Sequence, residues 1–176
     1  MRILFIIPYV PTRIRVRPYN LLKTMVERGH QVTLATLWSS KTERKQLGSL
    51  ENLGLKVLAV PLPRLRSLRN CLGVLPTSTP LQAIYCWQPN LKEALQTLLK
   101  TEHFDVIHVE HLRGSHYGLA LTGRGIPIVW DSVDCISHLF EQAVVHSRTL
   151  FGKWITRLEL NRTRYYEGWL VNQFQA

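Results

Sequence analysis

The chain has 176 residues, of which 45% are hydrophobic and 19% are charged, proportions that suit a folded domain and exclude an intrinsically disordered chain. Its net charge of +10 favours an anionic partner, such as nucleic acid, anionic lipid or a phosphorylated small molecule. The first apolar run covers only residues 3–7, which is too short for a secretory signal, and no run is long enough to span a membrane. Three cysteines without a CxxC pair suit a reducing compartment. We therefore expect a single cytoplasmic domain over residues 1–176.

Apolar runs alternate with helical patterns along most of the chain. The runs predict buried strands over residues 2–7, 31–37, 55–60, 104–109 and 126–131. The patterns between them predict helices over residues 17–28, 41–52, 89–101 and 113–123. From Ile136 onward the pattern is helical with no further strand. Strands separated by helices are typical of βαβ units, so the expected fold is α/β: a Rossmann-like, three-layer domain with a mostly parallel sheet.

The residues that follow the predicted strands are expected to form one rim, because ligands of an open parallel sheet bind at the carboxyl ends of its strands. The first rim segment, PYVPTRIRVR (residues 8–17), has no glycine. A dinucleotide-binding turn needs several glycines, so that backbone N–H groups can close on a pyrophosphate. Arg13, Arg15 and Arg17 are instead expected to hold a phosphate or a carboxylate with their guanidinium groups, unless the turn is only a solvated basic loop.

Three histidines occur in the segment HVEHLRGSH, residues 108–116. We expect His108 to be a core histidine with its hydrogen bonds satisfied. His111 follows the strand and is equally compatible with a functional and a structural role. A zinc site of His108, His111 and His116 is disfavoured, because side chains three positions apart at a strand end point to opposite faces of the sheet. No metal is therefore expected.

Two carboxylates lie in WDSVDC, residues 130–135. A glycosidase-type acid/base pair is disfavoured, since both groups follow one strand of a basic protein. Asp131 is expected to accept hydrogen bonds at the rim. Asp134 is expected to cap the helix that follows.

The segment PRLRSLRNCLGVLP, residues 63–76, interleaves leucines with Arg64, Arg66 and Arg69. As a helix, it could lie on an anionic membrane surface with these arginines toward the lipid headgroups. An ordinary helix that packs its leucines on the sheet, with its arginines in solvent, fits the same pattern. The sequence leaves both interpretations open.

Four pieces of the sequence resemble the N-terminal domain of family 4 glycosyltransferases, in particular the exopolysaccharide-type sugar transferases of bacteria. They are MRILFIIPYVP, RPYNLLKTMVERGHQVTLATL, FDVIHVEHLRG and IPIVWDSVDCIS. They follow the family's order over nearly the whole chain. The resemblance implies the GT-B architecture, in which two Rossmann-like domains face each other across a cleft. The N-terminal domain mainly holds the acceptor, the C-terminal domain holds the nucleotide-sugar donor, and transfer retains the anomeric configuration, usually without metal.

The end of the chain departs from the family pattern. The segment WITRLELNRTRYYEGWLVNQF resembles the helix before the last strand of the N-terminal domain, but the chain stops at Ala176. The resemblance therefore implies a truncated acceptor-side domain, lacking its last strand and the donor domain and inactive alone. It binds no cofactor itself, and the nucleotide sugar is left to a donor domain in cis or on a separate chain. Glutamates eight apart, such as Glu159 and Glu167, lack the surroundings of the family's donor signature and are interpreted as chance.

The resemblance also points to site residues. In many relatives, a histidine just beyond this strand touches the transferred sugar or the acceptor hydroxyl. Glu110 or His111 is its equivalent here, and His111 is the preferred catalytic candidate. The acceptor-binding candidates are Arg13, Arg15, Arg17, Glu110, Arg113 and Asp131.

A sugar or lipid-linked acceptor is expected, and the expected process is surface polysaccharide or glycolipid synthesis. The protein would then be peripheral at the inner face of the bacterial membrane. Two other functions stay open: a non-catalytic partner subunit that binds a glycan, and a basic α/β module that binds nucleic acid. The last has the charge but no recognisable nucleic-acid module, so nucleic acid is not an expected partner.

Overall fold

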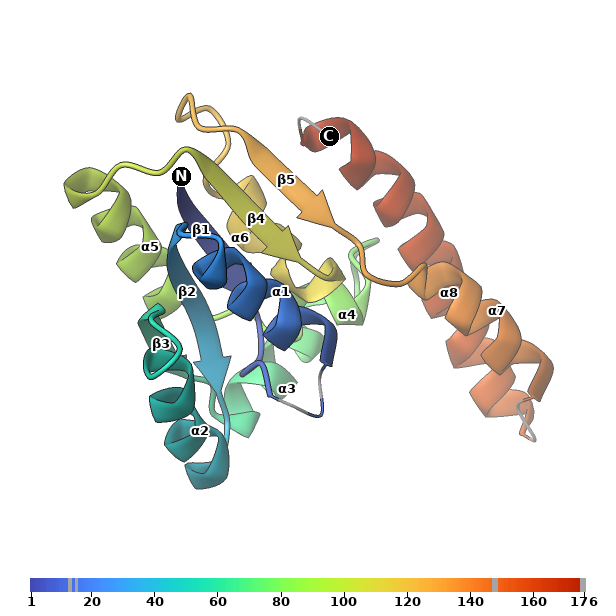
Figure 1. Ribbon diagram of the computed structural model, residues 1–176. Helices are drawn as coiled ribbons and strands as arrows, with labels where there is room; N and C mark the ends of the chain where they lie inside the picture. The colour runs from blue at the N-terminus through green and yellow to red at the C-terminus, as the bar shows by residue number, and fades with distance from the viewer. Residues whose placement is uncertain (13, 15, 147–148, 175–176) are drawn as a thin grey trace.

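The computed structural model describes residues 1–12, 14, 16–146 and 149–174. Its centre is a sheet of five parallel strands in the order β3-β2-β1-β4-β5 (Figure 1). The strands are β1 (Arg2–Ile7), β2 (Gln31–Trp38), β3 (Lys56–Pro61), β4 (Val106–Glu110) and β5 (Ile128–Asp131). All five predicted strands are confirmed to within two residues, and so is the α/β, Rossmann-like fold class.

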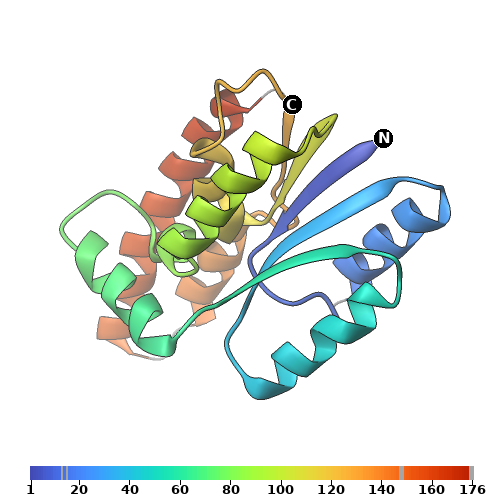
Figure 2. The same ribbon diagram turned by 90° about the vertical axis from the view of Figure 1, so that its left-hand side faces the viewer.

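Helices cover both faces of the sheet, which explains why its central strands are apolar on both sides. On one face, Leu22 and Leu50 pack against Phe5 of β1. On the other, Leu91 and Leu95 pack in the cluster that includes Leu4 and Ile6 of the same strand. Figure 2 shows the sheet between these two layers. The covering helices are α1 (Val16–Glu27) and α2 (Lys41–Glu51) on the first face, and α3 (Arg64–Val74), α4 (Leu81–Ile84), α5 (Pro89–Thr101) and α6 (Ser115–Leu119) on the second.

The helix predicted over residues 113–123 is shorter than expected. The chain forms a single 3-10 turn, η1 (Leu112–Gly114), followed by α6, which ends at Leu119. The loop beyond it turns at Gly123 and Gly125, whose φ angles are 78° and 74°. These left-handed conformations suit glycine and are incompatible with a continuing helix.

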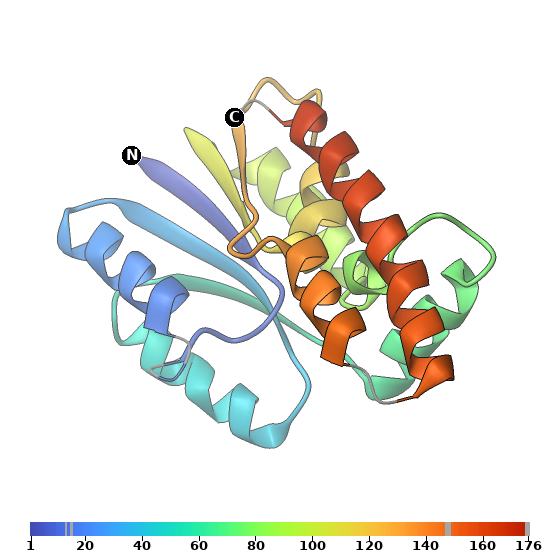
Figure 3. The same ribbon diagram turned by 90° about the vertical axis from the view of Figure 1, so that its right-hand side faces the viewer.

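Two helices follow β5 and confirm the helical prediction for the C-terminal region. α7 (Ile136–His146) and α8 (Leu150–Leu170) run in opposite directions beside the sheet, and the short turn η2 (Val171–Gln173) follows (Figure 3). Within the described residues, no strand follows α8. No helix in the described ranges has both the length and the apolar character that crossing a membrane requires.

Carboxylates of α8 hold the neighbouring helices in place. The Glu167 side chain accepts hydrogen bonds from the backbone N–H of Ile136 at 2.9 Å and of Ser137 at 3.3 Å, at the start of α7. Glu159 accepts one from the N–H of Leu81 at 2.9 Å, at the start of α4. The prediction that Asp134 caps α7 is therefore wrong, because a residue from α8 occupies the capping position. Glu159 and Glu167, interpreted from the sequence as a chance pair, both have structural roles.

Candidate functional site

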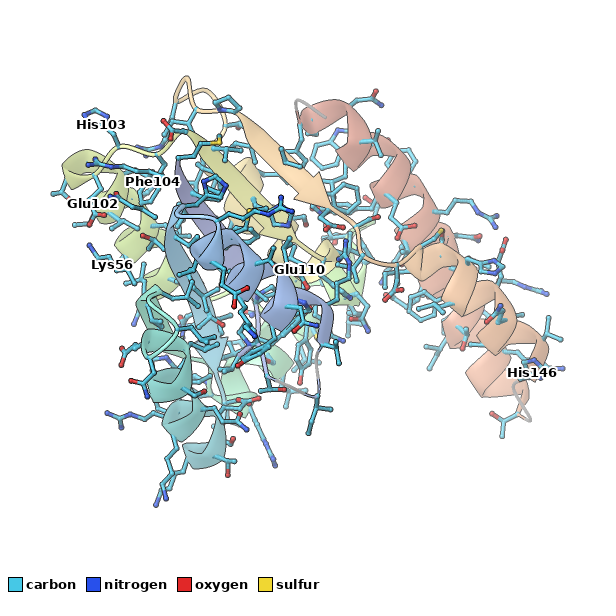
Figure 4. The ribbon with its side chains drawn as sticks, in the orientation of Figure 1. Lys56, Glu102, His103, Phe104, Glu110 and His146 are labelled. Carbon is cyan, nitrogen blue, oxygen red and sulfur yellow. The ribbon has the colours of Figure 1, made fainter. Side chains whose placement is uncertain are left out.

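Polar side chains gather where β1, β4 and β5 end, on the face covered by α1. The Tyr9 hydroxyl donates to Glu110 Oε1 at 2.6 Å. Arg17 Nη2 donates to Asp131 Oδ2 at 2.5 Å, and His108 Nε2 lies 3.7 Å from the same oxygen. Figure 4 labels Glu110 at the end of β4, whereas the ion pair of Lys56 with Glu102 lies at the other end of the sheet. We call Tyr9, Arg17, His108, Glu110 and Asp131 the polar cluster.

The strand register explains why these residues meet. His108 and Glu110 are two positions apart in β4, so both point to the same face. There His108 stacks on Phe5, with ring centroids 4.5 Å apart. Glu110 is paired with Asp131 across β4 and β5, which brings two carboxylates together. Arg17, in the first turn of α1, is paired with Asp131, and its charge offsets part of the negative charge of both carboxylates.

Burial dominates the electrostatics of the cluster. Glu110 is 0% exposed, and this burial raises the pKa of its carboxyl group, although the hydrogen bond from Tyr9 and the charge of Arg17 oppose the shift. Burial likewise lowers the pKa of His108, so the neutral imidazole is favoured. Hydrogen bonding to Asp131 raises the pKa of Arg17, which stays cationic.

Two buried atoms of the cluster, Glu110 Oε2 and His108 Nε2, have no hydrogen-bond partner among the described residues. The expectation of a satisfied core histidine at position 108 is therefore wrong. Buried polar atoms are rarely left unpaired, because desolvation without a hydrogen bond destabilises the fold.

A cavity of about 300 Å³ opens beside the cluster, at the carboxyl ends of β1, β2 and β3. Tyr9 belongs to both the polar cluster and the cavity wall. Arg113 donates to Gln82 Oε1 at 2.7 Å and stacks over the Tyr85 ring, with its guanidinium carbon 5.4 Å from the ring centroid. Further lining residues are Trp38, Ser39, Glu43 and Arg64. We call this the carboxyl-edge cavity.

The start of α2 forms one side of this cavity. Ser40 is the N-cap residue and accepts a hydrogen bond from the Glu43 N–H at 3.1 Å. Glu43 reaches back to the N–H of Ser39 at 2.7 Å and to its hydroxyl at 2.9 Å. This reciprocal arrangement resembles a capping box, and it fixes the Glu43 carboxylate at the cavity wall.

His111 lies apart from the polar cluster. Together with Arg113 and Asp134 it lines a second cavity of about 380 Å³, whose other wall is the apolar face of α7. His111 Nδ1 accepts a hydrogen bond from the Arg113 N–H at 3.2 Å, so the proton of the neutral ring is on Nε2. Burial, reinforced by the charge of Arg113, lowers the pKa of His111 to about 4.

The backbone is strained where β4 and β5 end. His111 has a φ of 67° and Val133 a φ of 64°, and a left-handed φ is unfavourable for residues with a Cβ atom, above all for a β-branched one. The turn at Val133 is held by its N–H, which donates to Asp131 Oδ1 at 3.0 Å. Such strain persists only where the surrounding structure imposes it, and it concentrates at functional sites.

The predicted site residues thus fall into three groups. Arg17, Glu110 and Asp131 belong to the polar cluster, Arg113 lines both cavities, and His111 lines only the second. Arg13 and Arg15 lie outside the described residues. Sequence reasoning missed Tyr9, Trp38, Glu43 and Tyr85, although the strand-end rule could have found the first two, which stand at or just beyond the ends of β1 and β2.

Comparison with known proteins agrees with the fold. The family model described as glycosyl transferase 4-like domain matches residues 14–175, nearly the whole chain. Comparison with curated proteins finds no match. The five-stranded parallel sheet, its two helical layers and this match together support a glycosyltransferase-type function. The chain therefore belongs to the family of glycosyl transferase 4-like domains.

Proposed function

We propose that this chain is the acceptor-binding half of a retaining glycosyltransferase of GT-B architecture, acting in bacterial surface polysaccharide or glycolipid synthesis. A second Rossmann-like domain, in cis or on a separate chain, would hold the nucleotide-sugar donor. The observation that carries the proposal is the carboxyl-edge cavity, which combines aromatic rings, guanidinium groups and a fixed carboxylate where ligands of parallel sheets bind.

The cavity has the chemistry that a sugar requires. The rings of Trp38 and Tyr85 offer flat apolar surfaces for the C–H face of a pyranose. Glu43 accepts hydrogen bonds from sugar hydroxyls, and the volume of about 300 Å³ is at the small end of ligand pockets. These groups orient one or two sugar residues.

Two guanidinium groups give the site its preference for anionic acceptors. Arg64 and Arg113 both line the cavity, and an arginine can hold a phosphate through two parallel hydrogen bonds. Arg113 is oriented by Gln82 and Tyr85, which limits the entropy it loses on binding. A phosphorylated or lipid-diphosphate-linked sugar therefore fits better than a free sugar.

Glu110 acts in this proposal as a positioning residue. It is fully buried and lines neither cavity, but it holds the hydroxyl of Tyr9, which does line the carboxyl-edge cavity. Arg17 and Asp131 form a partly exposed pair beside it. An acceptor hydroxyl that enters between Arg17 and Asp131 can donate a hydrogen bond to Asp131. This agrees with the sequence-based assignment of Arg17 and Asp131 as acceptor-binding residues.

His111 is proposed to contact the transferred sugar. Its ring is neutral near pH 7 and has its Nε2 proton available for donation, because Nδ1 is occupied by the Arg113 N–H. The second cavity, which it lines, shares Arg113 with the first. A ligand that spans Arg113 therefore reaches both.

Calorimetric titration with hexose 1-phosphates, and with the free hexoses, tests the proposal. We expect the phosphorylated sugars to bind more tightly, and Arg113→Gln to weaken them about tenfold to a hundredfold, since a charge-assisted hydrogen bond contributes roughly 1.5–3 kcal/mol. The matched control is Arg124→Gln, on the exposed loop before β5. Equal affinity of both variants, with unchanged unfolding midpoints, would contradict the assignment of the cavity.

A non-catalytic glycan-binding subunit would use the same cavity. Assays with the donor domain supplied separate the two functions, because a glycosyltransferase half then supports transfer of labelled sugar and a binding subunit does not.

A further inference from the structure

Helix α3 presents its leucines to solvent and the side chains of Ser67 and Asn70 to the domain. Asn70 Nδ2 donates to the carbonyl oxygens of Ile84 at 3.2 Å and Trp87 at 2.7 Å, and Ser67 is 3% exposed. On the outer side, four leucines form a continuous stripe, which we call the leucine stripe. They are Leu65, Leu68, Leu72 and Leu75, with exposed fractions of 79%, 56%, 57% and 51%.

This orientation excludes one of the two interpretations of the segment. The alternative in which its leucines pack on the sheet is wrong. Isolated exposed leucines are common, but a stripe of four along one helix is an apolar surface that suits an apolar partner.

The surface around the stripe is basic. Arg64 and Arg69 are exposed on α3, and Arg66 is half-buried there. Residues 62–80 contain no aspartate or glutamate. The partner of this surface is therefore expected to be both apolar and anionic.

The middle of α8 lies beside the C-terminal end of the stripe. Arg162 Nη2 donates to the carbonyl oxygen of Leu75 at 2.6 Å, so the end of α3 lies against α8. Figure 1 shows the N-terminal end of α8 well away from α3, so only the middle of α8 lies near the stripe. Leu158 is one helical turn before Arg162 and is 39% exposed.

We infer that α3 forms a surface that docks on an anionic bilayer. The charge favours a bilayer over a protein partner, because a membrane offers an apolar layer beneath a sheet of negative headgroups, which matches leucines flanked by basic side chains. The inference stands on this surface alone and does not require the proposed function.

The membrane-docking inference and the proposed function are compatible with each other. Arg64 starts α3 and lines the carboxyl-edge cavity, and a helix of 11 residues is about 16 Å long. A bilayer docked on α3 would thus lie within about that distance of the cavity, which suits an acceptor carried on a lipid.

Vesicle co-sedimentation with the whole chain tests the inference. Vesicles of equal parts phosphatidylglycerol and phosphatidylcholine are compared with vesicles of pure phosphatidylcholine. We expect binding to the anionic vesicles only, falling as salt is added. The double variant Arg66→Glu/Arg69→Glu should bind at least about thirtyfold more weakly, from the contribution of each basic residue near a charged leaflet. Arg64 is left unchanged because it lines the cavity.

The matched control is Lys41→Glu/Lys45→Glu in α2, which makes the same change of charge on the opposite layer and should bind like the parent. A second variant, Leu65→Gln/Leu68→Gln/Leu72→Gln, should keep its unfolding midpoint and lose vesicle binding. Equal binding to both vesicle types, or undiminished binding by either α3 variant, overturns the inference. The inference is also overturned if the parent chain binds no vesicles and the leucine variant loses only self-association, because the stripe is then a contact between protein chains.

Discussion

Replacing Glu167 by alanine tests how α8 holds α7 against the domain. The change removes two hydrogen bonds, from the N–H groups of Ile136 and Ser137. Both of these residues are buried, each 8% exposed, so water replaces the lost acceptor poorly. Loss of an N-terminal cap costs about 1–2 kcal/mol, and loss of a negative charge at a helix N-terminus about 0.3–1 kcal/mol more. Alanine is the best helix former, so α8 itself is not weakened.

We therefore expect the free energy of unfolding to fall by about 2 kcal/mol and the thermal midpoint by about 4–8 °C for a chain of this size. Urea denaturation followed by circular dichroism measures the first quantity, and calorimetry the second. Glu167→Gln, which keeps an acceptor oxygen, should lose about half as much. Glu93→Ala, at an exposed position of α5, is the control. A Glu167→Ala variant as stable as Glu93→Ala would refute the capping role.

Three further predictions concern the site. Tyr9→Phe leaves the buried Glu110 Oε1 without its 2.6 Å partner and should destabilise the fold by about 1–2 kcal/mol in urea denaturation. The control is Tyr165→Phe, at an exposed position of α8. The folded-state pKa of His111 is lowered to about 4. Its contribution to stability is therefore complete above the unfolded pKa of about 6.5 and is lost as pH falls toward 4. Between pH 7 and pH 5 the free energy of unfolding of the parent should fall by about 2 kcal/mol more than that of His111→Gln. The 176-residue polypeptide assayed alone should transfer no labelled sugar from nucleotide sugars, since transfer requires both substrates in one closed cleft; turnover by the purified chain would contradict the half-site proposal.

The strands and their common rim could be predicted from the sequence, because they depend on local signals. Runs such as RILFII and QVTLATL are apolar on both faces, a pattern that a doubly covered parallel sheet imposes. The strand-end rule then located Arg17, Glu110 and Asp131. The register of β4 and β5 brings the two carboxylates together, and Arg17 of α1 pairs with Asp131.

What the sequence could not decide depends on contacts between distant segments. Glu110 and His111 are adjacent but have different surroundings, and no composition signal marks the positive φ of His111 at the end of β4. Asp134 is a good capping residue by type, but Glu167 comes in from α8 and occupies the site. The pattern of α3 defines a stripe without saying which side faces inward; the hydrogen bonds of Asn70 to two carbonyl groups of a later segment decide it.

The central claim, that the carboxyl-edge cavity binds the acceptor sugar, can be tested most directly by the indole N–H resonances of the tryptophans in ¹⁵N-labelled protein. Of the described tryptophans, Trp38 alone lines this cavity, so the others serve as internal controls. On titration with a hexose 1-phosphate, the account predicts a saturable shift of the Trp38 signal that is weakened at least tenfold in Arg113→Gln and kept in Arg124→Gln. A saturable shift centred on Trp130 or Trp169 instead, with Trp38 unmoved, would contradict it.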